Sequence, residues 1–234
     1  MTDQPGTRSD GASARRTDGG PEDGVDGAND ADGPDDSATS PRVGGVVLAA
    51  GLGSRFEGGN KLLAEVDGRP VVERAAKTLR RSAVAEVVAV VGHEAERVTA
   101  AVDGLTDAVR RNEDYAAGQS TSVRVGVAAA RERGWDAAVF MLGDMPFVRP
   151  ATVDAVVAAY ARGDGSIVAP AYDGRRGNPA LFGKRHYDAL ADVSGDRGGR
   201  DLIETHEDSV LVDVDDPGVT RDVDFRADLE SDAE

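Results

Sequence analysis

The sequence predicts an α/β domain in which helices cover both faces of a largely parallel β-sheet. Short runs of apolar, β-branched residues alternate along the chain with longer stretches that have the apolar spacing of a helix. The strand-like runs are apolar at nearly every position, which is typical of parallel strands that are buried on both faces. The chain has 234 residues and no internal repeat, so one large domain accounts for it.

Strands and helices are expected in a regular order from residue 46 onward. The predicted strand–helix pairs are Val46–Ala50 with Val71–Leu79, Val87–Val91 with Ala95–Val102, and Ala137–Leu142 with Val153–Tyr160. A further strand follows at Ile167–Ala169. The order strand, helix, strand favours parallel pairing, because a parallel partner needs a crossover connection.

The pattern breaks after Pro170. Asp173-Gly174 is a turn signal between two short segments, Ala169–Tyr172 and Pro179–Phe182, and it predicts an inserted hairpin. The chain then closes the domain with three expected elements: a helix around Asp201–Thr205, a strand at Val210–Val214 and a last strand that ends near Val223.

Acidic residues dominate the charge balance, with 43 Asp and Glu against 27 Lys and Arg, so the net charge is −16. Such a chain has no dispersed basic surface for a nucleic-acid backbone. Residues 1–42 are acidic and almost without large apolar side chains, and we expect them to form a disordered tail ahead of a domain at 43–230. Lysine occurs three times only, and this acidic, Lys-poor composition resembles that of salt-adapted proteins.

Cysteine is absent, which excludes disulfides, thiolate zinc sites and a Cys nucleophile. No apolar run approaches the roughly 20 residues that span a bilayer. Arg15-Arg16 is followed by polar residues rather than by the apolar segment of an export signal. We therefore expect a cytoplasmic protein that binds neither membranes nor nucleic acids.

A glycine-rich loop follows the first strand, at Leu48–Phe56. Glycines let the backbone approach a ligand and point successive N–H groups at a phosphate, while Arg55 and Lys61 add cations. The chain contains no Gly-Lys-Ser/Thr of a Walker A loop, and Phe56 replaces the third glycine of a dinucleotide fingerprint. The loop therefore predicts a nucleoside-triphosphate site of a third kind.

Asp144 comes directly after the strand Ala137–Leu142, and we expect it at the same sheet edge as the glycine loop. Mg²⁺ prefers one or two carboxylates together with phosphate oxygens. A second carboxylate is available in Asp222-Val223-Asp224. The first and third residues of an extended segment face the same way, so this pattern alone does not choose between Asp222 and Asp224.

Leu48–Arg55 together with Asn60-Lys61-Leu62-Leu63 resembles the signature of the MobA-like NTP transferases, and within them the MocA-type molybdenum cofactor cytidylyltransferases. The resemblance continues through Gly92-His93-Glu94 and the segments 112–123, 142–146, 174–179, 195–198 and 215–218. It implies a Rossmann-like, three-layer α/β/α nucleotidyltransferase fold with a mostly parallel central sheet and a small β-hairpin insertion.

The resemblance also implies an activity: transfer of a nucleoside monophosphate from an NTP to a phosphorylated acceptor, with release of pyrophosphate. CTP is the favoured nucleotide, because Ala50 stands where the guanylyl-transferring form has glycine. Molybdopterin is the favoured acceptor, and a molybdoenzyme or a cofactor chaperone is the implied protein partner. Two alternatives stay open, namely transfer to a sugar phosphate or another small phosphorylated acceptor, and nucleotide or cofactor binding without turnover.

Site residues carried over from the resemblance fall into four groups. The catalytic residues are Lys61, Arg55 and Asp144. The nucleotide-binding residues are Leu48, Ala49, Ala50, Gly51, Gly53, Arg55, Lys61, Gly118, Ser120 and Ser122. Magnesium is assigned to Asp144 and to Asp224, which the match favours over Asp222. The acceptor-binding residues are Arg176, Asn178, Asp196 and Arg197.

Three further residue types have structural interpretations. Ser120 and Ser122 could equally be caps of a helix that begins there. We interpret His93 and His186 as structural, because they fit no metal-ligand spacing. Trp135 stands alone before a strand and is expected to pack in the core.

Overall fold

The computed structural model describes residue 1 and residues 40–229, apart from 54–55, 57–58, 194 and 196–198. The predicted tail and the domain bounds 43–230 remain predictions, because residues 2–39 and 230–234 lie outside the described part. In the described chain, a central sheet has the strand order β10-β7-β9-β6-β1-β4-β5. These strands are β1 (Val43–Ala49), β4 (Val87–Val91), β5 (Ala108–Arg111), β6 (Ala137–Leu142), β7 (Ile167–Tyr172), β9 (Ala180–Gly183) and β10 (Ser209–Asp213).

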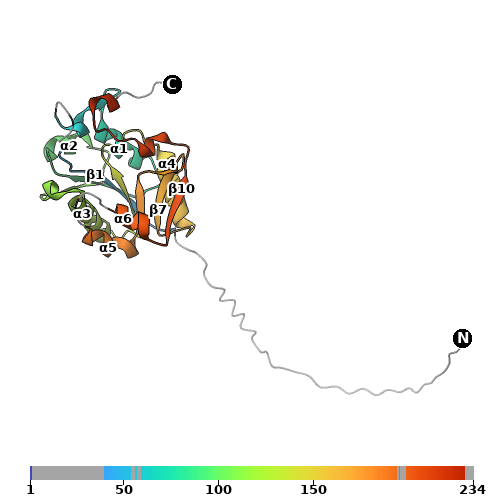
Figure 1. Cartoon of the computed structure of the whole chain (residues 1–234). Helices are drawn as coiled ribbons and strands as arrows, with labels where there is room; N and C mark the ends of the chain where they lie inside the picture. Colours follow the sequence, from blue (N-terminus) through green and yellow to red (C-terminus); the bar gives the residue numbers. More distant parts are fainter. Residues whose placement is uncertain (2–39, 54–55, 57–58, 194, 196–198, 230–234) are drawn as a thin grey trace, which may run out of the picture. The chain divides into compact units, whose positions relative to one another are not determined.

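Helices cover both faces of this sheet, as Figure 1 shows. One face packs against α1 (Val71–Arg80), α2 (Ala95–Ala101) and α4 (Pro150–Ala161). The other packs against α3 (Gln119–Glu132), α5 (Tyr187–Asp192) and α6 (Arg200–Thr205). The predicted three-layer α/β/α architecture with a mostly parallel sheet is confirmed.

Strand β1 lies at the centre of the sheet and is buried on both faces. Val46 and Val47 point to opposite faces, and neither is exposed. Each such valine stabilises the fold by roughly 1.5–3 kcal/mol relative to an exposed one. The unbroken apolar character of this strand is therefore a direct consequence of the two helical layers.

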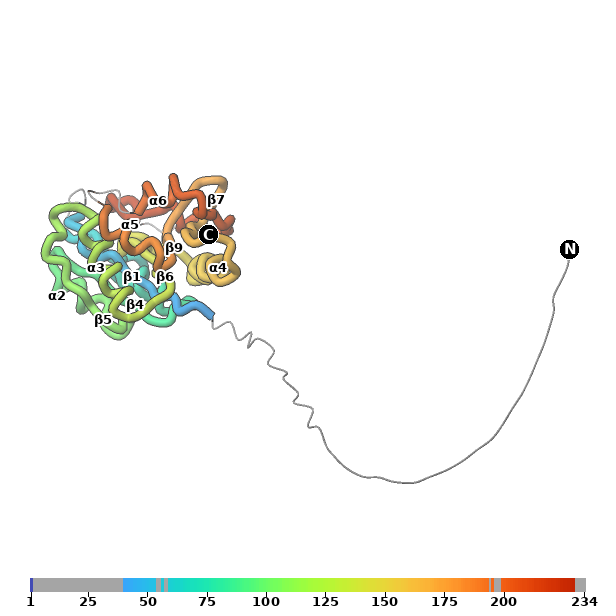
Figure 2. Tube along the Cα trace, turned by 90° about the horizontal axis from the view of Figure 1, so that it is seen from below, coloured from blue at the N-terminus to red at the C-terminus, as the bar shows by residue number. Residues whose placement is uncertain are grey.

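The sheet has a topological switch point beside β1. The chain moves from β1 through β4 to β5 on one side, and it then crosses to β6 on the other side of β1. Figure 2 shows β1, β4 and β6 side by side in the interior. Ligands of open α/β sheets bind outside the carboxyl ends of the strands at such a point. The glycine loop follows β1 and Asp144 follows β6, so both lie at this edge.

The inserted hairpin was predicted correctly at its turn and in its antiparallel pairing, but the sequence missed a two-residue strand after the turn and the second neighbour of the returning arm. β7 turns at Asp173-Gly174 and pairs antiparallel with the two-residue strand β8 (Arg175–Arg176). Residues 180–183 form β9, which lies between β6 and β7 and runs antiparallel to both. A turn signal indicates the strand on the other arm of the hairpin, here β7, but it does not reveal that a fully buried arm also pairs with β6 on its other side.

The predicted last strand near Val223 is wrong. Residues 221–224 form no strand, although the Val223 N–H donates to the Asp144 carbonyl oxygen at 2.9 Å. The Val223 side chain is fully buried in a small apolar cluster with Phe56, Val66 and Val71. Val66 belongs to a separate two-stranded ribbon, β2 (Glu65–Val66) and β3 (Arg69–Pro70). Packing on this cluster, rather than sheet pairing, fixes the segment.

Trp135 packs in the core as expected. It is 1% exposed, and its ring lies so close to β1 that a Cβ atom at Gly44 would come within 2.1 Å of it. In the described part of the chain, no helix has the length and apolar character needed to cross a bilayer.

His186 belongs to a buried polar cluster at the amino end of β7. Its Nε2 lies 2.7 Å from the Ser166 hydroxyl and accepts from Arg185 Nε, and its ring packs edge-on against His206. Ser166 in turn donates to Asp208. This satisfied network agrees with a structural role for His186.

Lowering the pH is expected to destabilise the fold through His186. Burial, with the nearby charges of His206 and Arg185, lowers the pKa of His186 from 6.5 to about 4. The unfolded chain therefore binds a proton that the native state does not, and stability falls as the pH drops from 6.5 through 4. Urea unfolding of the wild type and of His186→Gln between pH 7 and pH 4 measures this effect. We expect the free energies of unfolding to converge at low pH, and two parallel curves would contradict the assignment.

Candidate active site

The glycine loop leaves β1 with its backbone open to a ligand. Ala49 and Ala50 are buried beneath it, whereas a side chain at Gly51 would meet nothing within 4 Å. Gly53 has a φ of +59°, a conformation that favours glycine. It also covers the stem of Lys61, whose Cγ would lie 3.1 Å from a Cβ atom at position 53. The loop and Lys61 therefore form one unit.

Lys61 starts a short 3-10 helix, η1 (Lys61–Leu63), and the Asn60 side chain caps it by accepting from the Leu62 N–H. Its ammonium lies 2.6 Å from Asp144 Oδ2 and 2.8 Å from Asp224 Oδ1. Burial lowers the pKa of Lys61, but the two carboxylates outweigh burial and raise it overall. Lys61 thus carries a firm positive charge between two acids from distant parts of the sequence.

Three carboxylates meet at this point. Asp144, Asp222 and Asp224 each place one carboxylate oxygen within 4.8 Å of the other two. Burial and the charge of Asp144 raise the pKa of Asp222. Asp144 Oδ1 is buried and has no hydrogen-bond partner among the described residues. Hard oxygen donors and an unused, buried oxygen fit a divalent cation such as Mg²⁺ or Mn²⁺.

The arrangement of the trio follows from Val223. Its buried side chain and its hydrogen bond to Asp144 fix the middle of the segment, so Asp222 and Asp224 flank this anchor. Sequence pattern left these two aspartates as alternatives. The structure brings both of them to Asp144.

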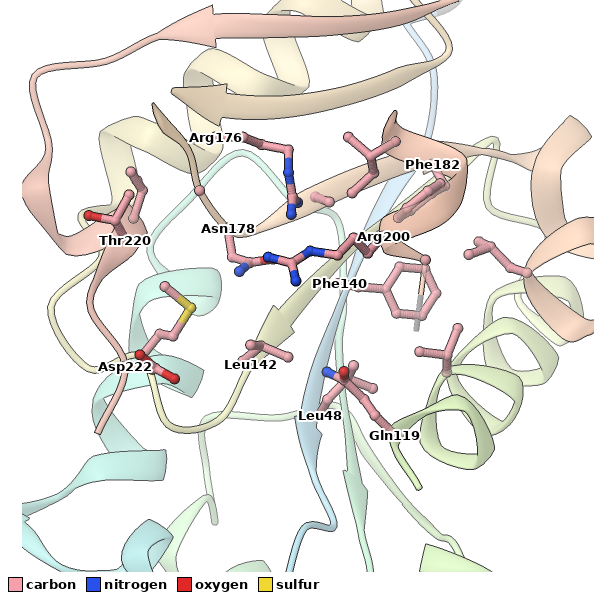
Figure 3. A pocket seen from close by; sticks show the side chains of 18 of the residues that line it. Leu48, Gln119, Phe140, Leu142, Arg176, Asn178, Phe182, Arg200, Thr220 and Asp222 are labelled. Carbon is pink, nitrogen blue, oxygen red and sulfur yellow. The ribbon is translucent and has the colours of Figure 1, made fainter. Parts of the chain in front are cut away.

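A cavity of about 450 Å³ opens beside the trio at the carboxyl ends of β1 and β6 (Figure 3). It is lined by residues from both predicted binding groups: Leu48 from the nucleotide group, and Arg176 and Asn178 from the acceptor group. Asp222 lines it as well and connects it to the carboxylate trio. One predicted nucleotide residue and two predicted acceptor residues therefore share a cavity with one of the acids, and the other described nucleotide residues do not line it.

The predicted nucleotide-binding turn lies at the start of α3. Gly118 precedes the helix with a φ of +106°, and no side chain caps the helix there. Ser120 and Ser122 are 1% and 6% exposed. The Asn112 amide donates to Ser122 Oγ at 2.9 Å, which ties the helix to the end of β5. The structure shows neither serine capping the helix, and Ser122 Oγ already accepts a hydrogen bond from Asn112.

Three of the predicted residues, Arg55, Asp196 and Arg197, lie outside the described residues. Sequence reasoning missed other residues that line the cavity, among them Gln119 and Arg200, whereas Arg175 lies within the segment 174–179 that it had singled out. Arg200 stands close to the segment 195–198 that the sequence had singled out, so adjacency was the available signal. Gln119 directly follows Gly118 and had the same signal.

Comparisons with known proteins agree with this geometry. Residues 45–210 match the model of the MobA-like NTP transferase domain family. The nicotine blue oxidoreductase of Paenarthrobacter nicotinovorans is 33% identical over 193 residues, which cover 75% of this chain and 93% of that protein.

Two solved structures are similar in fold as well as in sequence. A nucleotidyl transferase from Methanothermobacter thermautotroptrophicus is 27% identical, with a TM-score of 0.69 over 80% of this chain and 94% of that one. The Rv0371c protein of Mycobacterium tuberculosis, in complex with manganese, is 28% identical, with a TM-score of 0.64 over 80% and 95% of the two chains. The family match covers most of the chain and the fold is that of nucleotidyltransferases, so this chain belongs to the MobA-like NTP transferase family.

Proposed function

We propose that the protein transfers the cytidylyl group of CTP to a phosphorylated acceptor, molybdopterin, and releases pyrophosphate. One observation carries this proposal: the Lys61 ammonium and three carboxylates stand together, and one of these acids, Asp222, lines a cavity with Arg176 and Asn178. A triphosphate needs cations and backbone donors at one end, and an acceptor needs space beside them. Both requirements meet at the carboxyl ends of β1 and β6.

The protein has to supply little covalent chemistry for this reaction. An acceptor phosphate is already anionic at neutral pH, so it can attack the α-phosphorus without a general base. A bond forms between the acceptor oxygen and the α-phosphorus, and the bond from the α-phosphorus to the bridging oxygen breaks, which releases pyrophosphate. Catalysis then consists of positioning the two substrates in line and neutralising charge.

Lys61 has the central role among the residues of this chain. Its stem lies against Gly53, so its ammonium is within reach of a triphosphate held by the amides of residues 51–53. There it neutralises the charge that develops on the leaving pyrophosphate. The backbone amides add fixed partial charges at the same place.

Asp144 and Asp224, with Asp222 beside them, are the residues that would hold a divalent cation. Such an ion, when bound, orients the triphosphate and offsets its negative charge. The relative crystallised with manganese supports a divalent cation in this family, and we propose Mg²⁺ for this chain.

The preference for CTP rests on Ala50. Its methyl group and Tyr115 both pack against Gly92, where a Cβ atom would come within 2.8 Å of either side chain. A glycine at position 50 would leave more room at this edge, as a purine requires. The proposal also places the protein in the cytoplasm, where a molybdoenzyme or a cofactor chaperone takes up the product.

Pyrophosphate release tests the proposal. The purified full chain is incubated at high salt with Mg²⁺ and CTP, GTP, ATP or UTP, each with molybdopterin, with a sugar 1-phosphate or with no acceptor. We expect pyrophosphate with CTP and molybdopterin together. Release with the sugar phosphate alone would transfer the assignment to the sugar nucleotidyltransferases. A protein that binds CTP and releases no pyrophosphate with any acceptor is a binder without turnover.

A further inference from the structure

The cavity beside the carboxylate trio has a charge opposite to that of the chain. The protein as a whole carries a net charge of −16. Yet the described charged residues that line the cavity are three arginines and one acid, namely Arg175, Arg176, Arg200 and Asp222. The negative field of an acidic protein repels anionic ligands. A site for an anion in such a protein therefore needs basic side chains grouped at the site itself.

Arg176 and Arg200 form the core of this positive charge. Both approach the same carboxylate, with Arg176 Nη2 at 3.9 Å and Arg200 Nε at 3.4 Å from Glu204 Oε1. Burial, followed by the charge of Arg200, lowers the pKa of Arg176. Figure 3 shows both side chains pointing into the same part of the cavity, beside Asn178. Two guanidinium groups share a half-exposed glutamate there, and this leaves them able to bind an anion.

The arginine pair and the carboxylate trio have different charged neighbours. The charged groups that shift the pKa of Asp222 are Asp144, Asp224 and Lys61. Those that shift the pKa of Arg176 are Arg200 and Glu204. One cavity therefore has two charged regions of different character, one for a metal and phosphate and one for a second anion.

An apolar floor completes the cavity. Phe140 and Phe182 meet edge to face with ring centroids 6.0 Å apart, and both belong to the cavity wall. The remaining apolar lining includes Leu48, Leu142, Leu190 and Ile203. Phe140 is 6% exposed and Phe182 is 2% exposed, so these apolar side chains shape the cavity and offer little open surface.

We propose that Arg176 and Arg200 bind a second anionic group of the acceptor, separate from the phosphate that attacks the nucleotide. The planar guanidinium fork suits a carboxylate or another oxyanion bound through two hydrogen bonds. Glu204 competes with that anion for both arginines. This inference rests on the proposed function, because it specifies the acceptor of the same site.

Binding of pterin-6-carboxylate, a fluorescent, planar and anionic pterin without a phosphate, tests the inference. We expect the wild type to bind it and Arg200→Ala to weaken binding about tenfold or more, since a charge-assisted contact is lost. Glu204→Gln removes the competing carboxylate and should strengthen binding about two- to fivefold. Arg162→Ala, which removes an exposed arginine paired with Asp164, should leave binding unchanged.

Opposite effects of Arg200→Ala and Glu204→Gln distinguish ligand binding from a structural role, which would make both variants weaker. No binding to the wild type at millimolar concentration, or equal binding by the wild type and Arg200→Ala, would overturn the inference. A rise in the Kd for CTP in Arg200→Ala, with unchanged pterin binding, would also overturn it and place the arginines in the nucleotide site. Failure of the pyrophosphate assay with normal pterin binding would instead count against the cytidylyl transfer alone.

Discussion

Lys61→Ala should lower the rate of acceptor-dependent pyrophosphate release by a factor of about 10²–10³, because a donor aimed at developing charge is typically worth about 3–4 kcal/mol. The fold should remain, since the helices and strands that carry the site do not depend on the ammonium. Rate measurements at saturating CTP, with circular dichroism as a check on folding, decide the point. Turnover near that of the wild type would remove the basis for the proposed mechanism.

Lys184→Ala is the matched control for this variant. Lys184 also pairs with an aspartate, lying 2.8 Å from Asp136 Oδ1, but it is an exposed surface lysine that does not line the cavity. Loss of a lysine and of its ion pair should therefore leave the rate unchanged at this position. A similar loss in both variants would point to net charge rather than to the site.

The three layers of this fold could be predicted from the sequence because of residues such as Val46 and Val47. A strand that is buried on both faces must be apolar throughout, and such a run is visible without any structure. Crossover helices between such runs determine parallel pairing. The carboxyl edge, and with it the placement of Lys61 and Asp144, then follows from topology.

The contacts between segments far apart in the chain could not be predicted from the sequence. The turn at Asp173-Gly174 indicated that β9 pairs with β7, but no local signal encodes its pairing with β6 on the other side. The alternation in Asp222-Val223-Asp224 suggested a strand, but the anchoring of Val223 depends on Phe56 and other distant residues. Arg200 was not predicted as a site residue for the same reason, since its role depends on which cavity it faces.

Asp144→Asn is expected to reduce the affinity for Mn²⁺ more than either Asp222→Asn or Asp224→Asn does. Asp144 contributes a buried oxygen without a hydrogen-bond partner among the described residues, so a cation is the natural occupant of that position. An amide nitrogen or a neutral oxygen there removes one negative charge from the donor set. Titration of the metal with the nucleotide-free protein, followed by electron paramagnetic resonance of free Mn²⁺, measures the three affinities.

Lys61 makes the same titration more informative. Its ammonium bridges Asp144 and Asp224 at 2.6 and 2.8 Å, and a divalent cation that binds to these carboxylates must compete with it. Lys61→Ala should therefore bind Mn²⁺ more tightly than the wild type, although it turns over more slowly. Tighter metal binding with slower turnover separates the two roles of the lysine, as a counter-ion of the acids in the free protein and as a partner of the triphosphate during the reaction. Weaker Mn²⁺ binding in Lys61→Ala would instead mean that the lysine organises the carboxylates for the metal.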